Sequence, residues 1–402
     1  MSAGVLVAGA GEAGVRLAAA LRENGYAEPI LLVGEEMHPP YQRPPLSKAF
    51  LSGTAGDDAL ALRSPEFYQE QDITVRTGVR VEDAVLDADG RGTASLSDGT
   101  TVRFDRLALA TGARARTLPF SGSNVHVLRS RDDAVRLRLA LEHAKRVVLI
   151  GAGFIGLEIA AVARKRGIEV VVLEQQPRLL SRVAAEPLSE FLLAAHRGWG
   201  AEFVLGSGVA AVEPDGVRLA DGEFVAADTI VAGVGAVPEI GLAQRLGLAC
   251  DRGVLVDAFC RTSNPAVVAI GDCAAQPHPH RPGASLGLES VQNAGDQARA
   301  AAATLTGRPA PPRAVPWFWS DQGDLKIQIA GVSDGHDRYV VRGGDGGLTV
   351  LYYRAGSLIA ADAVNRPGDF MAVKRALAAG KTIAPENAAD LARPLKTLVT
   401  EA

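Results

Sequence analysis

Two stretches of the chain, at residues 5–35 and 147–174, repeat one pattern of apolar and glycine positions. Each opens with a run of aliphatic residues, enters a GxGxxG turn (residues 9–14 and 151–156), continues with helical periodicity and closes on a second aliphatic run. This order of elements is that of a βαβ dinucleotide-binding unit. The repeat therefore predicts an α/β fold with two Rossmann-like dinucleotide-binding domains.

The three glycines of each turn have separate roles. The first permits a tight turn, the second lets the backbone approach a pyrophosphate, and the third brings helix and strand together. Free N–H groups and the positive end of the helix dipole then favour the binding of the phosphate groups of the nucleotide. A single GxGxxG is weak evidence, but two of them, each followed by a carboxylate (Glu35 and Glu174), predict two nucleotide sites. The turn residues expected at these sites are Gly9, Gly11, Glu12 and Gly14 in the first unit and Gly151, Gly153, Phe154 and Gly156 in the second.

Residues 73–110 continue the first unit as short alternating runs, which favour strands. The last run is apolar throughout and ends at a turn formed by Ala110, Thr111 and Gly112. We expect the chain to enter the second dinucleotide-binding domain after this turn and to return around residues 235–245.

The returning segment carries two further candidates for cofactor contact. An aliphatic run at 267–270 leads into Gly271 and Asp272, so a carboxylate stands at a strand end, where ligands of open α/β sheets bind. The alternative is an exposed aspartate without a ligand. A helix is predicted over residues 289–305, and the positive end of its dipole would favour negative charge on a cofactor. The alternative is a helix whose role is packing alone.

The C-terminal part begins with a proline-rich linker and a cluster of aromatic residues that includes Trp317 and Trp319. Aromatic clusters belong to a core more often than to a cofactor site. One division has Trp317 and Phe318 packing the domain and Trp319 facing the cofactors. Alternating runs within residues 326–363 and a helical segment at 369–379 predict a small α+β domain, the expected lid and docking face.

Composition excludes several classes of protein. The chain has 402 residues, of which 47% are hydrophobic and 22% charged, and its net charge of −4 gives no general attraction to nucleic acid or an anionic membrane. No apolar run approaches the roughly 20 residues of a membrane span, and the first strand begins near Met1, so a cytoplasmic location is expected. Cys250, Cys260 and Cys273 form no CxxC pair, which argues against a dithiol centre, and no metal site is predicted.

A connector at residues 39–48 is rich in proline, whose fixed φ angles make it rigid and exclude a regular strand. It can hold Arg43 and Lys48 in fixed positions, and Ser47 and Lys48 begin a segment that reads as helix. The alternative for Lys48 is a solvated lysine at a helix start.

Several motifs together resemble a known family. The paired glycine turns combine with PPLSK (44–48), ATG (110–112), GDCA (271–274) and PWFWSDQ (316–322). In this combination the chain resembles the FAD-containing ferredoxin reductases of bacterial oxygenase systems, from about residue 4 to residue 370. The resemblance implies NADH:ferredoxin reduction, with FAD and NADH as cofactors and a two-iron ferredoxin as partner.

The resemblance also implies domain roles and individual contacts. It divides the chain into an FAD-binding domain in two parts, 1–115 and 244–316, an NADH-binding domain, 116–243, and a C-terminal α+β domain, 317–402. The implied FAD contacts are Ala13, Glu35, Arg43, Lys48, Val81, Arg129, Asp272 and Val291. The implied NADH contacts are Gly153, Ile155, Glu174, Arg182 and Gly235.

Three residues are expected to act in the reaction. Lys48 is expected to pair with Glu158, which stands two positions after the last glycine of the second turn, and to offset charge on reduced flavin. The alternative for Glu158 is a helix-surface carboxylate. Trp319 is the third. An acidic ferredoxin would dock on arginines, for which the candidates are Arg308, Arg313, Arg338 and Arg342.

Other electron acceptors remain to be weighed. Disulfide and peroxide reductases of this fold use a cysteine near the flavin, and residues 1–249 contain none, so that class is disfavoured. Monodehydroascorbate reductases, rubredoxin reductases and flavoproteins similar to apoptosis-inducing factor share more of the motifs. They stay the competing interpretations.

Overall fold

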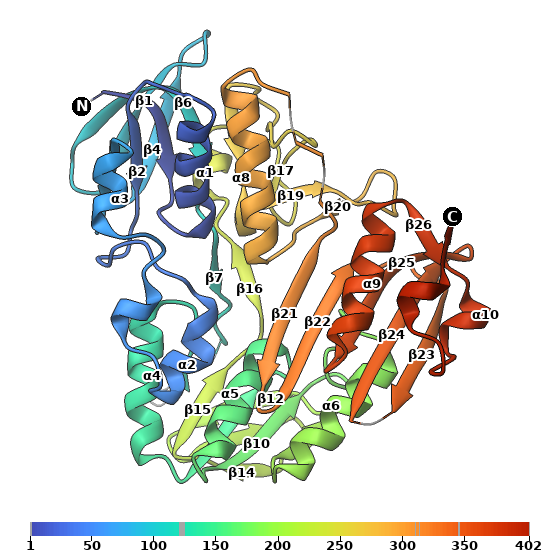
Figure 1. Ribbon diagram of the computed structural model, residues 1–402. Helices are drawn as coiled ribbons and strands as arrows, with labels where there is room; N and C mark the ends of the chain where they lie inside the picture. Colours follow the sequence, from blue (N-terminus) through green and yellow to red (C-terminus); the bar gives the residue numbers. More distant parts are fainter. Residues whose placement is uncertain (1, 120–124, 310, 313, 345, 402) are drawn as a thin grey trace. The chain divides into compact units, whose positions relative to one another are not determined.

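The computed structural model describes residues 2–119, 125–309, 311–312, 314–344 and 346–401. The chain folds into two compact units, whose elements are labelled in Figure 1. Unit 1 comprises Met1–Gln42, Asp57–Arg114 and Val237–Ala314; unit 2 comprises Arg43–Gly56, Ala115–Ala236 and Val315–Ala402. The chain passes between the units at β7 (Ala113–Ala115) and β16 (Ala236–Pro238), close to the expected crossing points.

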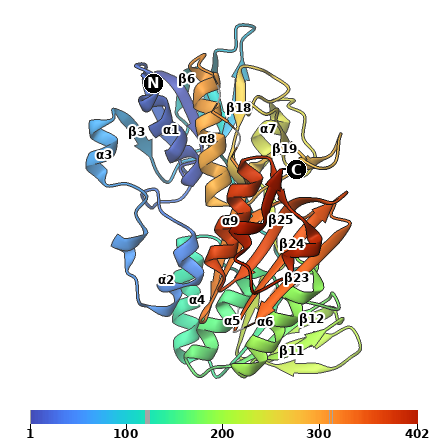
Figure 2. The ribbon, with the colours of Figure 1, turned by 45° about the vertical axis from the view of Figure 1, so that its right-hand side comes forward.

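The main sheet of unit 1 has a parallel and an antiparallel part, and β17, β19 and β20 form a second, smaller sheet. The parallel part has the order β3-β2-β1-β6-β18, and β4 and β5 extend β6 as an antiparallel meander. Two helices, α1 and α8, lie side by side in this unit (Figures 1 and 2). The main elements are β1 (Ser2–Ala8), α1 (Glu12–Glu23), β2 (Ile30–Val33), α3 (Pro65–Glu70), β3 (Ile73–Arg76), β4 (Val81–Leu86), β5 (Gly92–Leu96), β6 (Thr101–Leu109), α7 (Gly241–Arg245), β17 (Val254–Leu255), β18 (Val267–Ala269), η3 (Gly271–Cys273), β19 (Ala274–Pro277), β20 (Ser285–Leu286) and α8 (Val291–Leu305).

Strand β6 joins two runs that the sequence pattern predicts separately, 101–104 and 107–110. Its first half alternates between exposed and buried positions because it pairs with β5 at the border of the sheet. Its second half is buried continuously because β1 and β18 flank it on either side. The change of pattern within one strand explains why the sequence suggests two.

Unit 2 contains the second dinucleotide fold and the C-terminal domain. Its parallel sheet has the order β11-β10-β9-β15-β8, and β12, β13 and β14 form a separate antiparallel sheet. The elements before residue 240 are η1 (Pro44–Ser47), α2 (Ala49–Ser52), β8 (Val125–His126), α4 (Arg131–His143), β9 (Arg146–Ile150), α5 (Phe154–Lys165), β10 (Glu169–Glu174), α6 (Glu186–Gly198), β11 (Glu202–Leu205), β12 (Val209–Glu213), β13 (Gly216–Leu219), β14 (Phe224–Ala226) and β15 (Thr229–Ala232).

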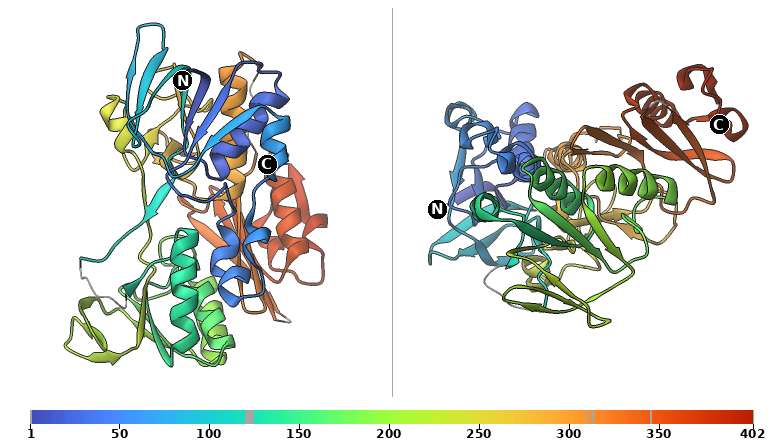
Figure 3. Two further views of the ribbon diagram at one scale, coloured as in Figure 1. Left: turned by 90° about the vertical axis from the view of Figure 1, so that its left-hand side faces the viewer. Right: turned by 90° about the horizontal axis from the view of Figure 1, so that it is seen from below.

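The connector at residues 43–56 packs as part of unit 2. The expected boundaries instead assign it to the first part of the FAD-binding domain, residues 1–115. The helical part of the connector is short: η1 is one turn of 3₁₀ helix, and α2 ends at Gly53, whose φ of 79° suits glycine. The short helix α2 lies beside α4 (Figure 3), where the Arg138 guanidinium stands 4.9 Å from the centre of the Phe50 ring. A second arginine, Arg166 at the end of α5, donates to the carbonyl of Leu51.

The C-terminal domain is a five-stranded antiparallel sheet of order β21-β22-β25-β24-β23. Its elements are β21 (Trp317–Gln322), β22 (Leu325–Gly331), β23 (Arg338–Gly344), β24 (Gly347–Arg354), β25 (Ser357–Val364), α9 (Pro367–Ala378), β26 (Lys381–Ile383), α10 (Pro385–Ala388), η4 (Leu395–Leu398) and β27 (Val399–Glu401). One face shares a core with α5 and α6, through residues such as Leu157, Leu188 and Val350. Helix α9 covers the opposite face (Figure 2).

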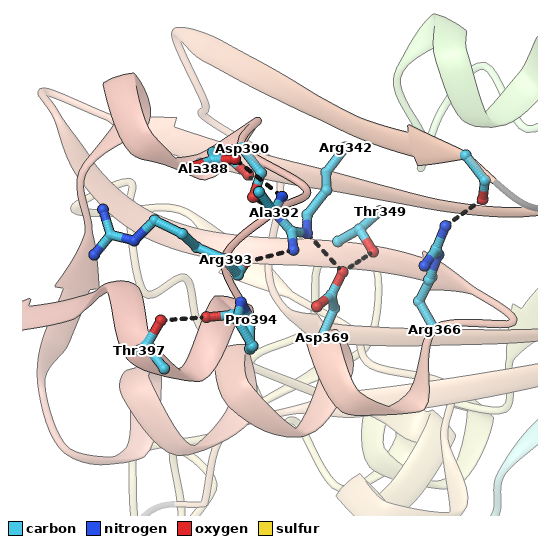
Figure 4. A network of polar contacts seen from close by, with 11 residues as sticks. Arg342, Thr349, Arg366, Asp369, Ala388, Asp390, Ala392, Arg393, Pro394 and Thr397 are labelled. Atoms are coloured by element: carbon cyan, nitrogen blue, oxygen red, sulfur yellow. Dashed lines mark hydrogen bonds and ion pairs between the residues drawn. The ribbon is translucent and has the colours of Figure 1, made fainter.

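Arg342 is a buried structural residue of this domain, so its expected role in ferredoxin docking is wrong. It is 5% exposed, and its guanidinium donates to the carbonyls of Ala388, Asp390 and Arg393 (Figure 4). Its Nε also donates to Asp369 at 3.1 Å. Every one of these partners lies in α9 or in the tail beyond it, so Arg342 fixes the C-terminal segment onto the sheet.

The other docking candidates differ from Arg342. Arg308 is exposed, and Arg338 is exposed with its guanidinium 3.9 Å from Glu386. Arg313 lies outside the described residues.

In the described part of the chain no helix is long and apolar enough to cross a membrane.

Replacing Arg342 by Met should lower the free energy of unfolding by about 3 kcal/mol, because Asp369 and several carbonyls lose a buried donor. Arg338→Met, on the same strand but exposed, is the matched control and should change it by less than about 0.5 kcal/mol. Urea unfolding followed by tryptophan fluorescence measures both. Equal midpoints for the two variants would contradict the assignment.

Candidate dinucleotide and redox site

The first glycine turn, between β1 and α1, has the geometry of an open phosphate cradle. Gly9 has a φ of 122°, its N–H donates to the Val33 carbonyl at 2.8 Å, and a methyl group there would lie 2.0 Å from the Ala110 oxygen. A methyl group at Gly14 would lie 2.0 Å from the Gly9 oxygen. At Gly11, by contrast, a methyl group would meet nothing within 4 Å. The outer glycines are therefore needed by the fold, while the middle one faces space that a ligand can use.

The second turn, between β9 and α5, repeats this arrangement. Gly151 donates to the Leu173 carbonyl at 2.7 Å. Methyl groups at Gly151 and Gly156 would lie 2.5 Å from the Gly233 oxygen and 2.4 Å from the Gly151 oxygen. Gly153 again has open space within 4 Å. Both turns thus fit a pyrophosphate held by backbone N–H groups at a helix N-terminus.

Among the other expected residues of unit 1, two pairs meet at the carboxyl ends of β1, β6 and β18. Ala110 follows β6 and touches Gly9, while a methyl group at Gly271, in η3 after β18, would lie 2.9 Å from the Ala13 Cβ. Thr111 donates from its hydroxyl to the Glu239 carbonyl at 2.6 Å. The remaining expected residues are Glu12 in the first turn of α1, Gly112 after β6, Asp272 in η3 and Val291 at the start of α8.

Gln297, on α8, is a supporting residue that the sequence does not reveal. Its side-chain oxygen accepts from the Gly271 N–H at 2.7 Å, and the residue is buried. It therefore fixes the turn that carries Asp272. No motif marks it, because it lies within an otherwise ordinary alanine-rich helix.

The two units differ at the end of their second strand. Gly9 bonds to Val33, and Gly151 bonds to Leu173, so the residue that matches Glu174 is Gly34. Glu35 comes one position later, is exposed, and accepts from Arg80 at 2.9 Å beside Val81, the first residue of β4. Its expected contact with a ribose stays a prediction.

Glu174 is part of the second glycine turn itself. Its carboxylate accepts from the Ala152 N–H at 2.8 Å and from the Gln176 N–H at 2.9 Å. Arg182 and Gly235, both expected at the NADH site, lie close together, since a methyl group at Gly235 would stand 3.7 Å from Arg182 Nη2. Ile155 is 43% exposed at the start of α5, as a ligand contact requires.

Arg178 lies in the segment between β10 and α6, as Arg182 does, and its guanidinium is hydrogen-bonded within that region. It donates to the carbonyls of Ala184 at 2.7 Å and Ser181 at 3.1 Å, and to the hydroxyl of Ser189 at 2.9 Å. Arginines near the ribose commonly bind the 2′-phosphate of NADPH. Since Arg178 is already engaged, this arrangement favours NADH.

Arg43 and Arg129, both expected to contact FAD, meet within unit 2. The Arg43 guanidinium donates to the Arg129 carbonyl at 2.6 Å. The remaining expected FAD contacts apart from Lys48 lie in unit 1. That all of them serve one cofactor stays a prediction.

The expected ion pair between Lys48 and Glu158 is present. Lys48 Nζ lies 2.8 Å from Glu158 Oε1, and Glu158 is 1% exposed, so it is no helix-surface carboxylate. Two serines donate to the same carboxylate: Ser320 to Oε1 at 2.6 Å, and Ser47 to Oε2. Neither serine was assigned from the sequence, although both stand in quoted motifs.

Strand β21 presents alternate residues to opposite sides. Phe318 packs on Phe154 of α5, with ring centres 4.9 Å apart, and Ser320 follows it on that side. Trp317 and Trp319 share the other side, with ring centres 5.4 Å apart. Trp317 packs on Phe370 of α9, with ring centres 6.0 Å apart, so Trp317 and Phe318 both pack the domain as expected, although from opposite sides of the strand. That Trp319 faces the cofactors stays a prediction.

Cys250, Cys260 and Cys273 form no disulfide with one another. Cys260 and Cys273 are buried, and burial raises the pKa of the Cys273 thiol, which keeps it protonated.

Two Rossmann-type units, each with a glycine turn that opens onto ligand space, define a dinucleotide-dependent oxidoreductase. A family model described as pyridine nucleotide-disulphide oxidoreductase matches residues 3–298, and one described as Reductase C-terminal matches residues 317–399. The chain belongs to this oxidoreductase family, which uses FAD and NAD(H).

Relatives match over nearly the whole chain. Rhodocoxin reductase of Rhodococcus erythropolis is 42% identical, and the alignment covers 98% of this chain and 94% of that protein. The putidaredoxin reductase of a covalent complex with putidaredoxin is 37% identical with a TM-score of 0.93, over 98% of this chain and 97% of that one. The ferredoxin reductase for the CYP199A2 system of Rhodopseudomonas palustris is 41% identical with a TM-score of 0.92, over 98% of each chain. The expected family and fold class are confirmed.

Substitution of the middle glycines separates ligand binding from folding. Gly11→Ala and Gly153→Ala have room for the methyl group, so both should fold with unchanged circular dichroism. Gly11→Ala should lose FAD, whereas Gly153→Ala should keep FAD and weaken NADH binding by about ten-fold, the loss of roughly one charge-assisted hydrogen bond. The control Gly14→Ala should fail to fold unit 1. Normal FAD content in Gly11→Ala would argue against the cradle.

Glu174→Gln tests the nucleotide preference. The amide oxygen can still accept from Ala152, but the negative charge that repels a 2′-phosphate is lost. We expect strong preference for NADH in the unmodified protein and a fall of about ten-fold in the ratio of kcat/KM for NADH over NADPH in the variant. Equal use of both nucleotides by the unmodified protein would refute the placement.

Proposed function

We propose that the protein is an NADH:ferredoxin reductase that uses FAD to pass electrons from NADH to a two-iron ferredoxin, which in turn serves a P450 or a ring-hydroxylating oxygenase. The observation that carries the proposal is the whole-chain likeness to reductases named for such iron–sulfur partners. The two cradles and the buried Lys48–Glu158 pair support it. A cytoplasmic location belongs to the proposal because NADH is regenerated inside cells.

Bound FAD supplies the chemistry that converts hydride transfer from one NADH into two single-electron transfers to two ferredoxins. The chain binds and orients. In the proposal the turn at Gly11 holds the FAD pyrophosphate, with Asp272 accepting from the sugar alcohol, and the turn at Gly153 holds that of NADH. Glu174 accepts from the adenosine ribose.

The proposed reacting region lies beside Lys48, Glu158 and Trp319. The Lys48 ammonium, held by the Glu158 carboxylate and 3.3 Å from the Pro44 carbonyl, places positive charge where the cofactor gains electrons. Trp319, half-buried on β21, offers a flat ring that excludes water from the nicotinamide. Both roles remain part of the proposal.

The choice of ferredoxin over other acceptors is supported by the cysteines. No cysteine precedes Cys250, so the chain offers no thiol in the N-terminal segment where disulfide and peroxide reductases of this fold carry one. Arg308 and Arg338 remain candidates for docking an acidic partner, since both are exposed. An electrostatically steered encounter of this kind weakens with salt.

Turnover of the FAD-loaded protein with different acceptors tests the function. We expect a two-iron ferredoxin to be reduced faster than rubredoxin or the monodehydroascorbate radical, and turnover to fall steeply as ionic strength rises toward about 1 M, where the Debye length is about 3 Å. Replacement of Cys250, Cys260 and Cys273 by serine should leave this turnover largely intact.

Two outcomes would count against this function. Higher turnover with the radical than with any ferredoxin favours the monodehydroascorbate reductase alternative. Reduction of bound FAD without turnover on any acceptor favours a redox-sensing flavoprotein.

A further inference from the structure

A chain of buried polar side chains runs from Glu158 into the C-terminal domain and on to helix α6. Ser320 Oγ bonds to Glu158 at 2.6 Å, Gln322 Nε2 bonds to Ser320 Oγ at 3.2 Å, and Gln322 Oε1 bonds to His196 Nε2 at 2.9 Å. Ser320, Gln322 and His196 are each 0% exposed. Three elements that are distant in sequence, α5, β21 and α6, are thereby joined by polar contacts inside unit 2.

The carboxylate end of this chain fixes the direction of every hydrogen bond in it. A carboxylate only accepts, so Ser320 must donate its proton to Glu158. The Ser320 oxygen then accepts from the Gln322 amide nitrogen, and the Gln322 oxygen accepts from His196. Each donor therefore points toward Glu158, and the positive ends of the aligned bonds face its negative charge.

This direction also fixes the form of the histidine. His196 must carry its proton on Nε2, and its Nδ1 has no hydrogen-bond partner among the described residues. A proton on Nδ1 would be a buried donor without an acceptor, which is unfavourable. Burial lowers the pKa of His196, which also favours the neutral imidazole. The rings of Trp199 and Phe203 pack beside it, with their centres 4.8 Å and 6.1 Å from the centre of the imidazole. The imidazole is thus a neutral, fixed donor.

We propose that Ser320, Gln322 and His196 are positioning residues for the reductive half-reaction, which hold the Glu158 carboxylate, and through it the Lys48 ammonium, in one orientation. Ser47 fixes Oε2, so the donor from Ser320 completes the restraint on Oε1 beside Lys48. Ser320 and Gln322 share the α5 side of β21. Their hydrogen bonds therefore also set the register of the strand, which presents Trp319 on the opposite side. The inference deepens the proposed function and rests on it.

Ser320→Ala removes the donor next to Glu158 and is the first test. The limiting rate of FAD reduction by NADH in stopped-flow experiments should fall on the order of ten-fold, with little change in the half-saturating NADH concentration. The flavin midpoint potential should shift as well, because the ammonium that faces the cofactor is less well fixed. Asp321→Ala, an exposed position on the same strand, is the matched control and should match the unmodified protein. Ser320→Thr, which keeps the hydroxyl, should restore most of the rate.

The effects should be transmitted in order along the chain. Gln322→Met and His196→Phe should lower the same rate by progressively smaller factors. His196→Phe should add nothing in a Ser320→Ala background, because the link to Glu158 is already cut. In protein without FAD, ¹⁵N NMR of labelled histidine should show the Nε2–H form of His196, and this form should be less well fixed in Gln322→Met. Independent, additive losses, or a normal reduction rate in folded Ser320→Ala with FAD bound, would overturn the inference.

The experiment separates this inference from the proposed function. The reduction of FAD by NADH is measured in these variants without any ferredoxin present, so its outcome does not depend on the acceptor. If the unmodified protein reduced no ferredoxin, the proposed acceptor would be wrong, while the stopped-flow comparison of FAD reduction by NADH would still decide the positioning role.

Discussion

The structure of unit 2 depends on one buried charge. Glu158 is 1% exposed at the start of α5, and a carboxylate removed from water is strongly destabilising unless it is paired and fully hydrogen-bonded. Its partners come from two separate segments: Ser47 and Lys48 from the connector, and Ser320 from the C-terminal sheet. Satisfying this single group therefore requires the connector, the dinucleotide fold and the C-terminal domain to be in place together. The connector and the C-terminal sheet belong to the same compact unit for this reason, although long stretches of sequence separate them.

Much of the fold could be predicted because its signals are local and periodic. The glycine turns lie between aliphatic runs and helices, and both βαβ units begin and end within a few residues of the expected positions. The pairing of Lys48 with Glu158 was also predicted, although only through the family resemblance. Strand β6 was harder to predict, because its neighbours change along its length and the pattern of burial changes with them. Pattern alone registers the environment of a strand and cannot distinguish one strand in two environments from two strands.

The errors arise where a residue type has two common uses. Arginines are usually exposed, so Arg342 suggested a surface for an acidic partner, yet it lies beneath the tail and binds its carbonyls. Ser320 and Gln322 are unremarkable residue types whose spacing by two shows only that they share a side of a strand. Their importance follows from what faces them, namely Glu158 and His196, which lie over a hundred positions away in sequence. Such partnerships are invisible in one sequence because nothing local requires them.

The difference between Gly34 and Glu174 limits how far the two halves of the protein are interchangeable. The βαβ units share the turn and the hydrogen bond from its first glycine to the second strand, but a methyl group at Gly34 would lie 2.6 Å from the Ala10 Cβ. No side chain fits at that point, so the first unit cannot acquire the acid of the second by a point substitution. A chimera that exchanged the two modules would need to change the packing of the turn as well as the ligand-binding residue. The two units are therefore not equivalent at this point: the close approach of Ala10 to Gly34 excludes from the first unit the carboxylate that the second unit carries there.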